Sequence, residues 1–117
     1  MRVLIAGGRD FTDKQFLTEY MSTYLGSVTT LISGTARGAD NLGEEWAKEN
    51  GIAIERYPAQ WSRDGKAAGP IRNAEMLKKG NPDLVVVFEG GKGSAHMASI
   101  SRKAGVNTVE PRKEIHK

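Results

Sequence analysis

The sequence contains no cysteine, which excludes disulfide bonds and thiolate metal sites. Its two histidines, His96 and His116, have no paired histidine and carboxylate at ligand spacing, so we expect neither a metal site nor a cofactor. No apolar run approaches the roughly 20 residues that a membrane-spanning helix needs. The apolar segment 3–6 is too short for the core of a signal peptide. These absences lead us to expect a cytoplasmic protein with no membrane partner.

The composition is that of one ordinary globular domain. The 117 residues are 38% hydrophobic and 26% charged, which suits a single modest core. We expect one domain over residues 1–110 and a C-terminal tail over 111–117. The net charge of +3 favours anionic partners, but it is far from the dense basic stripe of a dedicated DNA-binding protein. Nucleic acid is therefore not the expected partner.

Apolar runs and helical periodicities alternate along the chain. The five apolar residues at 84–88 are typical of a parallel strand that is buried on both faces. Thr12 is the expected N-cap of the first helix, with Gln15 completing a capping box, and Gly26 is expected to end that helix. Residues 58–69 are predicted to form a long polar connection. Strands are predicted at 3–6, 29–33, 52–57, 84–88 and 106–109, and helices at about 12–25, 39–50, 70–79 and 94–104.

This alternation predicts an α/β fold with an open, five-stranded parallel sheet between two layers of helices. The strands at 52–57 and 106–109 are partly polar and are expected at the sheet edges, which fits the strand order 3-2-1-4-5. In that order the winding reverses between the strands at 3–6 and 84–88. Ligands bind outside the carboxyl ends of the strands at such a point.

Three glycine-rich turns follow the strands that meet there. The third turn combines Gly90, Gly91, Gly93 and Ser94 between a buried strand and a helix. Bare backbone N–H groups at a helix N-terminus attract an anion, most often a phosphate. The alternative is a tight turn with a helix cap, although a cap needs fewer glycines. We therefore predict that this turn binds phosphate or a similar group, with Ser94 as an added donor.

The second turn spans residues 33–40 and places two glycines on either side of an arginine. This pattern favours a second anion cradle, although an ordinary turn would also explain it, and it matches neither a Walker loop nor the dinucleotide fingerprint. Asp40 is interpreted as a group that orients the turn rather than as a catalyst. The predicted ligand-binding residues here are Ser33, Gly34, Thr35, Arg37, Gly38 and Asp40.

The first turn contains Gly7, Gly8, Arg9 and Asp10. Arg9 could be a surface charge, but at the carboxyl end of a central strand a guanidinium fork for a phosphate or carboxylate is the favoured interpretation. Asp10 either accepts hydrogen bonds from ribose hydroxyls or caps the turn, and both interpretations stay open.

Further candidates come from the long connection and the helix that follows it. Trp61 either packs on the core or stacks on a base. Lys66 is a candidate cation. Arg72 and Asn73 are expected in the first turn of a helix that has Pro70 near its start, where a cation is unfavourable for the helix dipole. A bound anion would explain Arg72 better than stability does. Met97 falls on an apolar stripe and is interpreted as core.

Four motifs in this order resemble the YspA-like branch of the SLOG superfamily, which joins the DNA-processing protein A fold with the Lonely Guy (LOG) phosphoribohydrolases. The motifs are GGRDFTD at 7–13, SGTARGAD at 33–40, GPIRN at 69–73 and GGKGS at 90–94. The resemblance reaches to about Val109. It implies a Rossmann-like domain that binds a nucleotide or nucleotide-derived ligand, a homo-oligomer (dimer or tetramer), and a phage or defence context.

The resemblance also bears on catalysis. LOG enzymes carry Pro-Gly-Gly-x-Gly-Thr-x-x-Glu, and here Glu89 stands at the proline position, Ser94 at the threonine position and Met97 at the glutamate position. Methionine cannot act as an acid or a base, which counts against LOG-type hydrolysis. Arg72 could match the LOG arginine. Only Glu89 and Asp10 are nearby carboxylates that could substitute.

Three hypotheses follow. In the first, the protein binds a nucleotide-derived small molecule, as a sensor or sequestering protein, with Arg9, Arg37 and Arg72 as cation clamps. In the second, it is an enzyme that cleaves the glycosidic bond of a nucleoside monophosphate with Glu89 or Asp10. In the third, it binds single-stranded DNA, with an affinity that falls steeply with salt.

Overall fold

The structure is a computed structural model that describes residues 1–113. It confirms the predicted α/β fold, because five parallel strands form one sheet in the order β3-β2-β1-β4-β5. In the centre of the sheet, Leu4 lies between Ile32 and Val85. The strands are β1 (Arg2–Ala6), β2 (Thr30–Ser33), β3 (Ala53–Arg56), β4 (Leu84–Val87) and β5 (Asn107–Val109).

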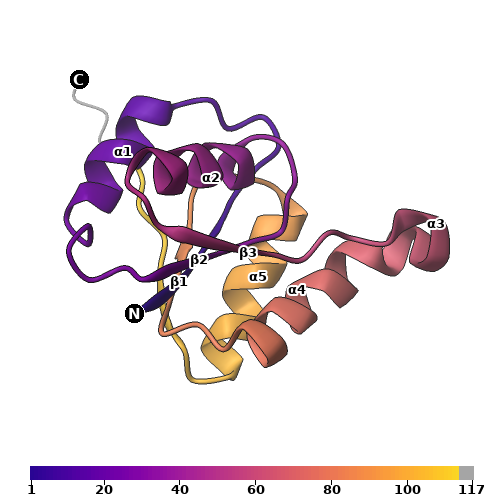
Figure 1. Cartoon of the computed structure of the whole chain (residues 1–117). Helices are drawn as coiled ribbons and strands as arrows, with labels where there is room; N and C mark the ends of the chain where they lie inside the picture. The colour runs from indigo at the N-terminus through magenta and orange to yellow at the C-terminus, as the bar shows by residue number, and fades with distance from the viewer. Residues whose placement is uncertain (114–117) are drawn as a thin grey trace.

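Helices cover both faces of the sheet, which gives the expected three-layer, Rossmann-like sandwich (Figure 1). The helices α1 (Lys14–Ser22) and α2 (Ala39–Glu49) lie on one face. The helices α4 (Ala68–Gly80) and α5 (Lys92–Lys103) lie on the other. The short helix α3 (Trp61–Asp64) lies at the end of an arm that extends away from the sheet (Figure 1).

Alternate residues of the central strands enter two separate cores, because successive side chains of a strand point to opposite faces. Val3 and Ile5 pack with α1 and α2 around the buried Trp46. Leu4 and Ala6 pack with α4 and α5. Residues 84–88 are buried throughout, so the prediction that this run is buried on both faces is confirmed.

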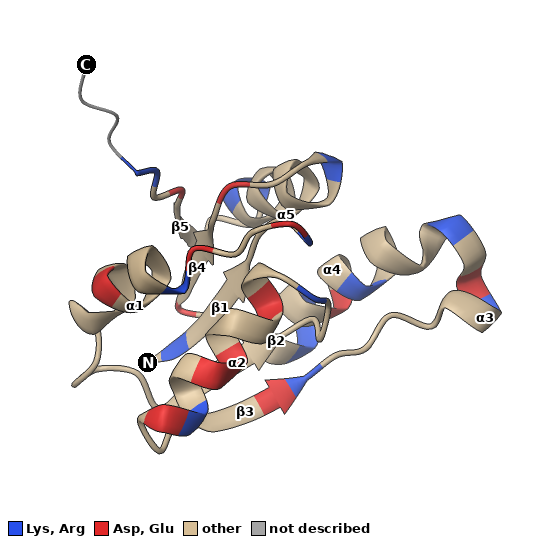
Figure 2. Cartoon of the chain, turned by 90° about the horizontal axis from the view of Figure 1, so that it is seen from above, with Lys and Arg blue, Asp and Glu red and all other residues tan. Residues whose placement is uncertain are grey.

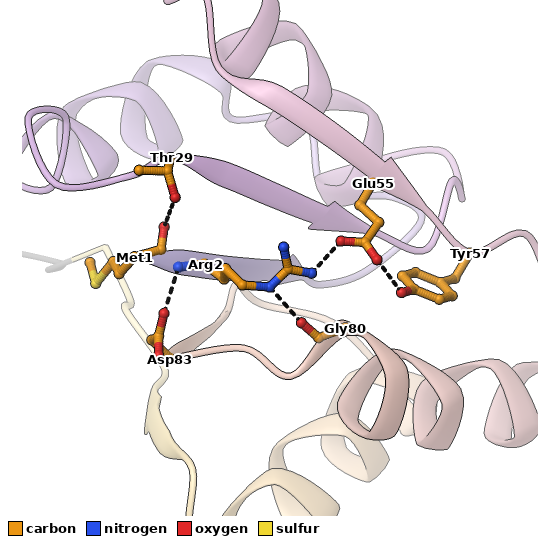
Figure 3. A network of polar contacts seen from close by, with 7 residues as sticks. All are labelled: Met1, Arg2, Thr29, Glu55, Tyr57, Gly80 and Asp83. Carbon is orange, nitrogen blue, oxygen red and sulfur yellow. Dashed lines mark hydrogen bonds and ion pairs between the residues drawn. The ribbon is translucent and has the colours of Figure 1, made fainter.

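The edge strands are partly polar, as predicted, and Arg2 ties β3 to the rest of the sheet (Figure 3). Its guanidinium forms an ion pair with Glu55 and donates to the carbonyl of Gly80 at 2.8 Å. Glu55 in turn accepts from the hydroxyl of Tyr57, and the carboxylate of Asp83 accepts from the backbone N–H of Arg2 at 2.7 Å. Together these bonds join β1, β3 and the end of α4.

The first helix differs from its prediction at both ends. Asp13, not Thr12, is its N-cap, since the Asp13 carboxylate accepts from the N–H of Phe16 at 3.1 Å. The helix ends at Ser22 rather than at Gly26. The hydroxyls of Ser22 and Thr23 bond back to carbonyls of the last turn, a competition that weakens helix continuation.

The connection at 58–69 is more regular than predicted. It contains α3 and a 3₁₀ turn (Gly65–Ala67), and α4 begins at Ala68. Arg72 and Asn73 therefore lie in the second turn of α4 and not in its first. This removes the helix-dipole argument for Arg72, because the dipole acts mainly within the first turn.

The start of the predicted tail contacts the domain. Arg112 donates to the carbonyl of Val87 at 2.9 Å, and Lys113 pairs with Asp13 at 3.3 Å. Residues 114–117, including His116, lie outside the described residues. Within residues 1–113, each helix is too short or too polar to span a bilayer.

Candidate ligand cleft

The three predicted turns meet at one edge of the sheet, with Gly8 at their centre. The N–H of Gly8 donates to the carbonyl of Glu89 at 2.9 Å, which joins the β1 turn to the β4 turn. The carbonyl of Gly8 accepts from the N–H of Ala39 at 3.1 Å, which joins it to the turn after β2. The predicted convergence of the turns is therefore confirmed.

Glycine is required where these backbones touch. A Cβ on Gly90 would lie 2.2 Å from the hydroxyl oxygen of Ser94 and 2.4 Å from the nitrogen of Gly8. A Cβ on Gly38 would lie 2.2 Å from the oxygen of Gly8, and Gly38 also has a φ of +81°. By contrast, a Cβ on Gly91 would meet no atom within 4 Å. Some glycines of these turns therefore serve packing, whereas Gly91 leaves its backbone open.

The turn after β2 differs from the predicted anion cradle. The hydroxyl of Ser33 accepts from the N–H of Thr35 at 3.1 Å, and the carboxylate of Asp40 accepts from the N–H of Ala36 at 3.2 Å. With the bond of Ala39 to Gly8, three amides of this turn are already satisfied within the protein. Asp40 thus orients the turn, as the sequence indicated, while among the described residues the N–H groups of Arg37, Gly38 and Asp40 have no hydrogen-bond partner.

The turn after β4 keeps its amides available. Among the described residues, the backbone N–H groups of Gly91, Lys92, Gly93 and Ser94 have no hydrogen-bond partner. The helix α5 begins at Lys92 with Gly91 as its N-cap, so Ser94 lies in the first turn rather than before it. Unsatisfied donors and the positive end of the helix dipole coincide here.

These amides line a cleft of about 560 Å³, which we call the ligand cleft. Its lining combines apolar side chains, which we call the apolar wall, with polar and cationic groups, which we call the polar rim. Its volume is in the range typical of small-molecule sites. The apolar wall consists of Ala6, Trp61, Pro70, Met76 and Met97. The polar rim consists of Arg9, Asp40, Arg72, Asn73, Ser94 and His96, with the backbone of Gly7, Gly8 and residues 91–93.

Arg72 is the half-buried cation of the ligand cleft. Its guanidinium donates to the carbonyl of Gly34 and, through Nε, to the side-chain oxygen of Asn73 at 3.1 Å. Burial lowers the pKa of Arg72, and the charge of Arg9 adds to this, whereas Asp40 opposes it. Burial raises the pKa of Asp40 to about 6, against the hydrogen bond from Ala36 and the charge of Arg72.

Arg9 and Trp61 form the outer part of the site. The guanidinium of Arg9 lies 5.3 Å from the ring centre of Trp61, in cation–π geometry. Trp61 is 50% exposed, so the interpretation of this residue as core is wrong. Both residues also line an adjoining pocket of about 500 Å³ that contains Gly34, Thr35, Arg37 and Arg72.

Nine predicted residues do not line the ligand cleft: Asp10, Ser33, Gly34, Thr35, Arg37, Gly38, Lys66, Glu89 and Gly90. Arg37 and Asp10 are largely exposed and lie 3.6 Å apart. Asp10 and Glu89 line an adjoining pocket of about 530 Å³ beside Phe11 and Phe16, which shares Gly8, Arg9 and Gly91 with the ligand cleft. Lys66 lies in the 3₁₀ turn of the arm and lines none of the three pockets.

Met76 and His96 line the ligand cleft although the sequence predicts no binding role for them. Met76 comes from the second half of α4, and its apolar character signals only a core position. His96 is a single histidine on α5 without the spacing of a metal ligand. In the structure Asn73 joins it to Arg72. Within residues 1–113, no group of three or more acidic or histidine side chains is placed to hold a metal ion.

The sequence profile described as "YspA, cpYpsA-related SLOG family" matches residues 1–63, more than half of the chain. The chain belongs to this family. The chain is also similar to the Gene 61 protein of Mycobacterium phage D29, with 31% identity over 118 residues, 92% of this chain and 94% of the phage protein.

The SLOG fold is also found in a solved structure, that of DNA processing protein A from Streptococcus pneumoniae. The similarity has a TM-score of 0.76 at 20% sequence identity, so it concerns the fold alone. It covers 97% of this chain and 51% of the other, and the chain therefore spans about half the length of that protein.

Met97 is buried and lines the ligand cleft. The lining is therefore apolar at the position where the motif resemblance to LOG enzymes would place their glutamate. The carboxylate that lines the cleft, Asp40, accepts from the Ala36 N–H.

Proposed function

We propose that this SLOG domain binds a nucleotide-derived small molecule in the ligand cleft, as a sensor or sequestering protein. The family and the fold support a role connected with nucleotides or with DNA processing. The observation that carries the proposal is that four consecutive free amides, 91–94, line the same cleft as the guanidinium of Arg72. An anionic group at this turn would receive both backbone donors and a cation.

The apolar wall accounts for the rest of the ligand. Met76, Met97 and Pro70 offer an apolar surface of the kind on which a base or sugar packs, and Trp61 stands at the open end beside Arg9. We place the phosphate at the β4 turn rather than at the β2 turn. Ser33 and Asp40 occupy the Thr35 and Ala36 amides of the β2 turn, and Gly34, Arg37 and Gly38 do not line the ligand cleft.

Calorimetry with matched ligands tests the proposal. The four nucleoside 5′-monophosphates are compared with the same nucleosides without phosphate. We expect at least one monophosphate to bind at least 10-fold more tightly than its nucleoside, because the free amides recognise the phosphate. Equal binding of the two, or no binding of any monophosphate, would contradict the proposal. Native mass spectrometry of protein purified from its host then identifies any co-purifying nucleotide.

The glycosidase hypothesis has weaker support. Its two carboxylates, Glu89 and Asp10, line the adjoining pocket beside Phe11 and not the ligand cleft. Arg72, on which LOG-type chemistry would rely, does not line that pocket. Chromatography of the same incubations decides this point, because release of free base above the buffer rate would establish turnover and overturn the pure binding function.

The DNA hypothesis rests on the fold shared with DNA processing protein A. Lysine, arginine and acidic positions are interspersed over the ribbon and do not gather on one side (Figure 2). Such a surface attracts a DNA backbone weakly. We expect an oligothymidylate to bind more weakly than the best monophosphate at 150 mM salt. Tight binding of the oligonucleotide with a steep salt dependence would reverse this ranking.

A further inference from the structure

A chain of hydrogen bonds runs from Arg72 through Asn73 to His96 at the polar rim of the ligand cleft. Nε of Arg72 donates to Oδ1 of Asn73 at 3.1 Å. Asn73 is only 6% exposed, so water does not compete freely for its amide. An arginine Nε always carries its proton and cannot accept. The oxygen of the Asn73 amide must therefore face Arg72, which fixes the orientation of this side chain.

The orientation of Asn73 determines which nitrogen of His96 carries the proton. The NH₂ group of Asn73 faces Nδ1 of His96 at 3.1 Å and the carbonyl of Gly93 at 3.3 Å. An amide NH₂ only donates, so Nδ1 of His96 must accept. The neutral ring then has its proton on Nε2. Among residues 1–113, this N–H has no hydrogen-bond partner.

We propose that His96 is a specificity-determining contact of the ligand cleft, which donates its Nε2–H to an oxygen of the anionic group held at the 91–94 turn. This inference rests on the function proposed above. His96 is half-buried in the second turn of α5 and lines the ligand cleft, one turn beyond the free amides. The NH₂ group of Asn73 donates to both the His96 ring and the Gly93 carbonyl. These bonds fix the position of the imidazole relative to the 91–94 turn.

The fixed tautomer gives the site chemical selectivity. The donors on this side of the cleft are the amides of 91–94, the ring N–H and the Ser94 hydroxyl, and of these only the hydroxyl can also accept a hydrogen bond. A phosphate oxygen satisfies all of them, whereas a hydroxyl or amine at the same place would leave most of these donors without an acceptor. The ligand class is therefore one with an acceptor-only group, such as a phosphate monoester, at the α5 N-terminus.

Nitrogen NMR of the histidine rings tests the tautomer without any ligand. In the full chain labelled with ¹⁵N-histidine, we expect the neutral ring of His96 to carry its proton on Nε2. The variant His96→Gln identifies which signals belong to His96 and which to His116. In Asn73→Asp the carboxylate would accept from both neighbours, and the proton of the neutral ring is expected on Nδ1. A wild-type ring with its proton on Nδ1 would overturn the proposal.

Calorimetry with the four monophosphates tests the contact itself. We expect His96→Ala to lose about 10-fold in affinity, the usual effect of removing one charge-assisted hydrogen bond. His96→Gln keeps an N–H near the position of Nε2 and should stay within about 3-fold of wild type. Ser99→Ala, an exposed position on the same helix that does not line the cleft, is the matched control and should not change affinity.

The outcomes separate this proposal from the function on which it rests. If wild type binds a monophosphate and His96→Ala binds it equally well, His96 is not a contact, although the cleft still binds nucleotides. If His96→Gln is as weak as His96→Ala while both melt like wild type, ring packing and not the N–H is responsible, and the proposal fails. If wild type binds no monophosphate, both proposals fall together.

Discussion

The turns after β2 and β4 look alike in sequence but differ in the state of their backbone. Each follows a buried strand, contains two or more glycines and leads into a helix. In the β2 turn, Ser33 and Asp40 occupy the N–H groups of Thr35 and Ala36, and the Gly8 carbonyl occupies that of Ala39. The β4 turn has no carboxylate at the corresponding place, and its amides from 91 to 94 remain free.

The difference shows that a glycine-rich turn is not in itself an anion site. What decides is whether an acceptor side chain nearby already occupies the amides. In the β2 turn the acceptors stabilise the loop and position Gly34, whose carbonyl in turn holds Arg72. The β2 turn therefore supports Arg72, whereas the β4 turn keeps free amides that can bind an anion.

Among the variants considered, Gly91→Val should have the largest effect on ligand binding at the β4 turn. We expect a loss of at least about 100-fold in monophosphate affinity, because a branched side chain would cover the free amides of the β4 turn. The fold should tolerate the change, since a Cβ at Gly91 meets no atom within 4 Å. Calorimetry measures the affinity and a thermal melt measures the stability.

Gly26→Val is the matched control for this experiment. Gly26 is exposed, a Cβ there also meets no atom within 4 Å, and it lines none of the three pockets. Its monophosphate affinity should equal that of wild type. Undiminished monophosphate affinity of Gly91→Val would show that the anion does not bind at the β4 turn.

Asp40→Asn tests the support role of the β2 turn through pH. Burial raises the pKa of Asp40 from 3.8 to about 6, so between these pH values the folded protein holds a proton that the unfolded chain has lost. The free energy of unfolding should therefore fall as pH rises through this window. The full difference corresponds to about 3 kcal/mol.

Asparagine does not titrate, so the variant should lack this part of the pH dependence while keeping an acceptor for Ala36. Urea unfolding of both proteins at pH 4, 5, 6 and 7 measures the difference. Parallel pH profiles for the two proteins would show that the buried carboxylate titrates at its ordinary pKa.

A pair of serine variants compares the two turns directly. Ser33→Ala removes the acceptor of the Thr35 N–H and the donor to Glu44, and we expect it to cost about 1–3 kcal/mol of stability. Its monophosphate affinity should stay within about 2-fold of wild type. Ser94→Ala should do the reverse, with an affinity loss of about 5-fold and little change in stability.

Chemical unfolding and calorimetry on the two proteins give all four values. The comparison would fail if Ser33→Ala weakened binding more than Ser94→Ala did. It would also fail if both variants changed only stability, since the two turns would then play the same part.

Lys66→Ala should have the smallest effect. Lys66 was a candidate cation in the sequence, but its place on the arm puts it outside the cleft and both neighbouring pockets. We expect less than about a 2-fold change in monophosphate affinity, the residual influence of one screened surface charge. A larger loss in calorimetry would mean that the arm closes over the ligand.

The order of the strands in the sheet could be predicted from the sequence, because the pattern of apolar residues in a strand indicates whether one or both of its faces are buried. The run at 84–88 is apolar at every position, as a central parallel strand must be, whereas the strand containing Glu55 alternates and belongs at an edge. The glycines then placed the turns at the carboxyl ends. The ends of the helices were harder to predict. At the end of α1 the hydroxyls of Ser22 and Thr23 bond to backbone carbonyls, and these bonds differ only slightly in free energy from a further turn of helix.

Hydrogen bonding within the site could not be predicted from sequence. The occupation of the β2 amides depends on the rotamers of Ser33 and Asp40, and spacing alone does not fix a rotamer. His96 was missed because a single histidine carries no spacing signal. Its role depends on Asn73, which comes from a different helix and meets it only in the folded chain.

The two tryptophans give the molecule separate optical reporters. Trp46 belongs to α2 and is 1% exposed, and its emission follows unfolding of the core. Trp61 lines the ligand cleft, is 50% exposed and has the Arg9 guanidinium over its ring. In a Trp46→Phe protein, the intrinsic tryptophan fluorescence would therefore come from Trp61 alone. It would report ligand binding beside this residue in real time and without a label.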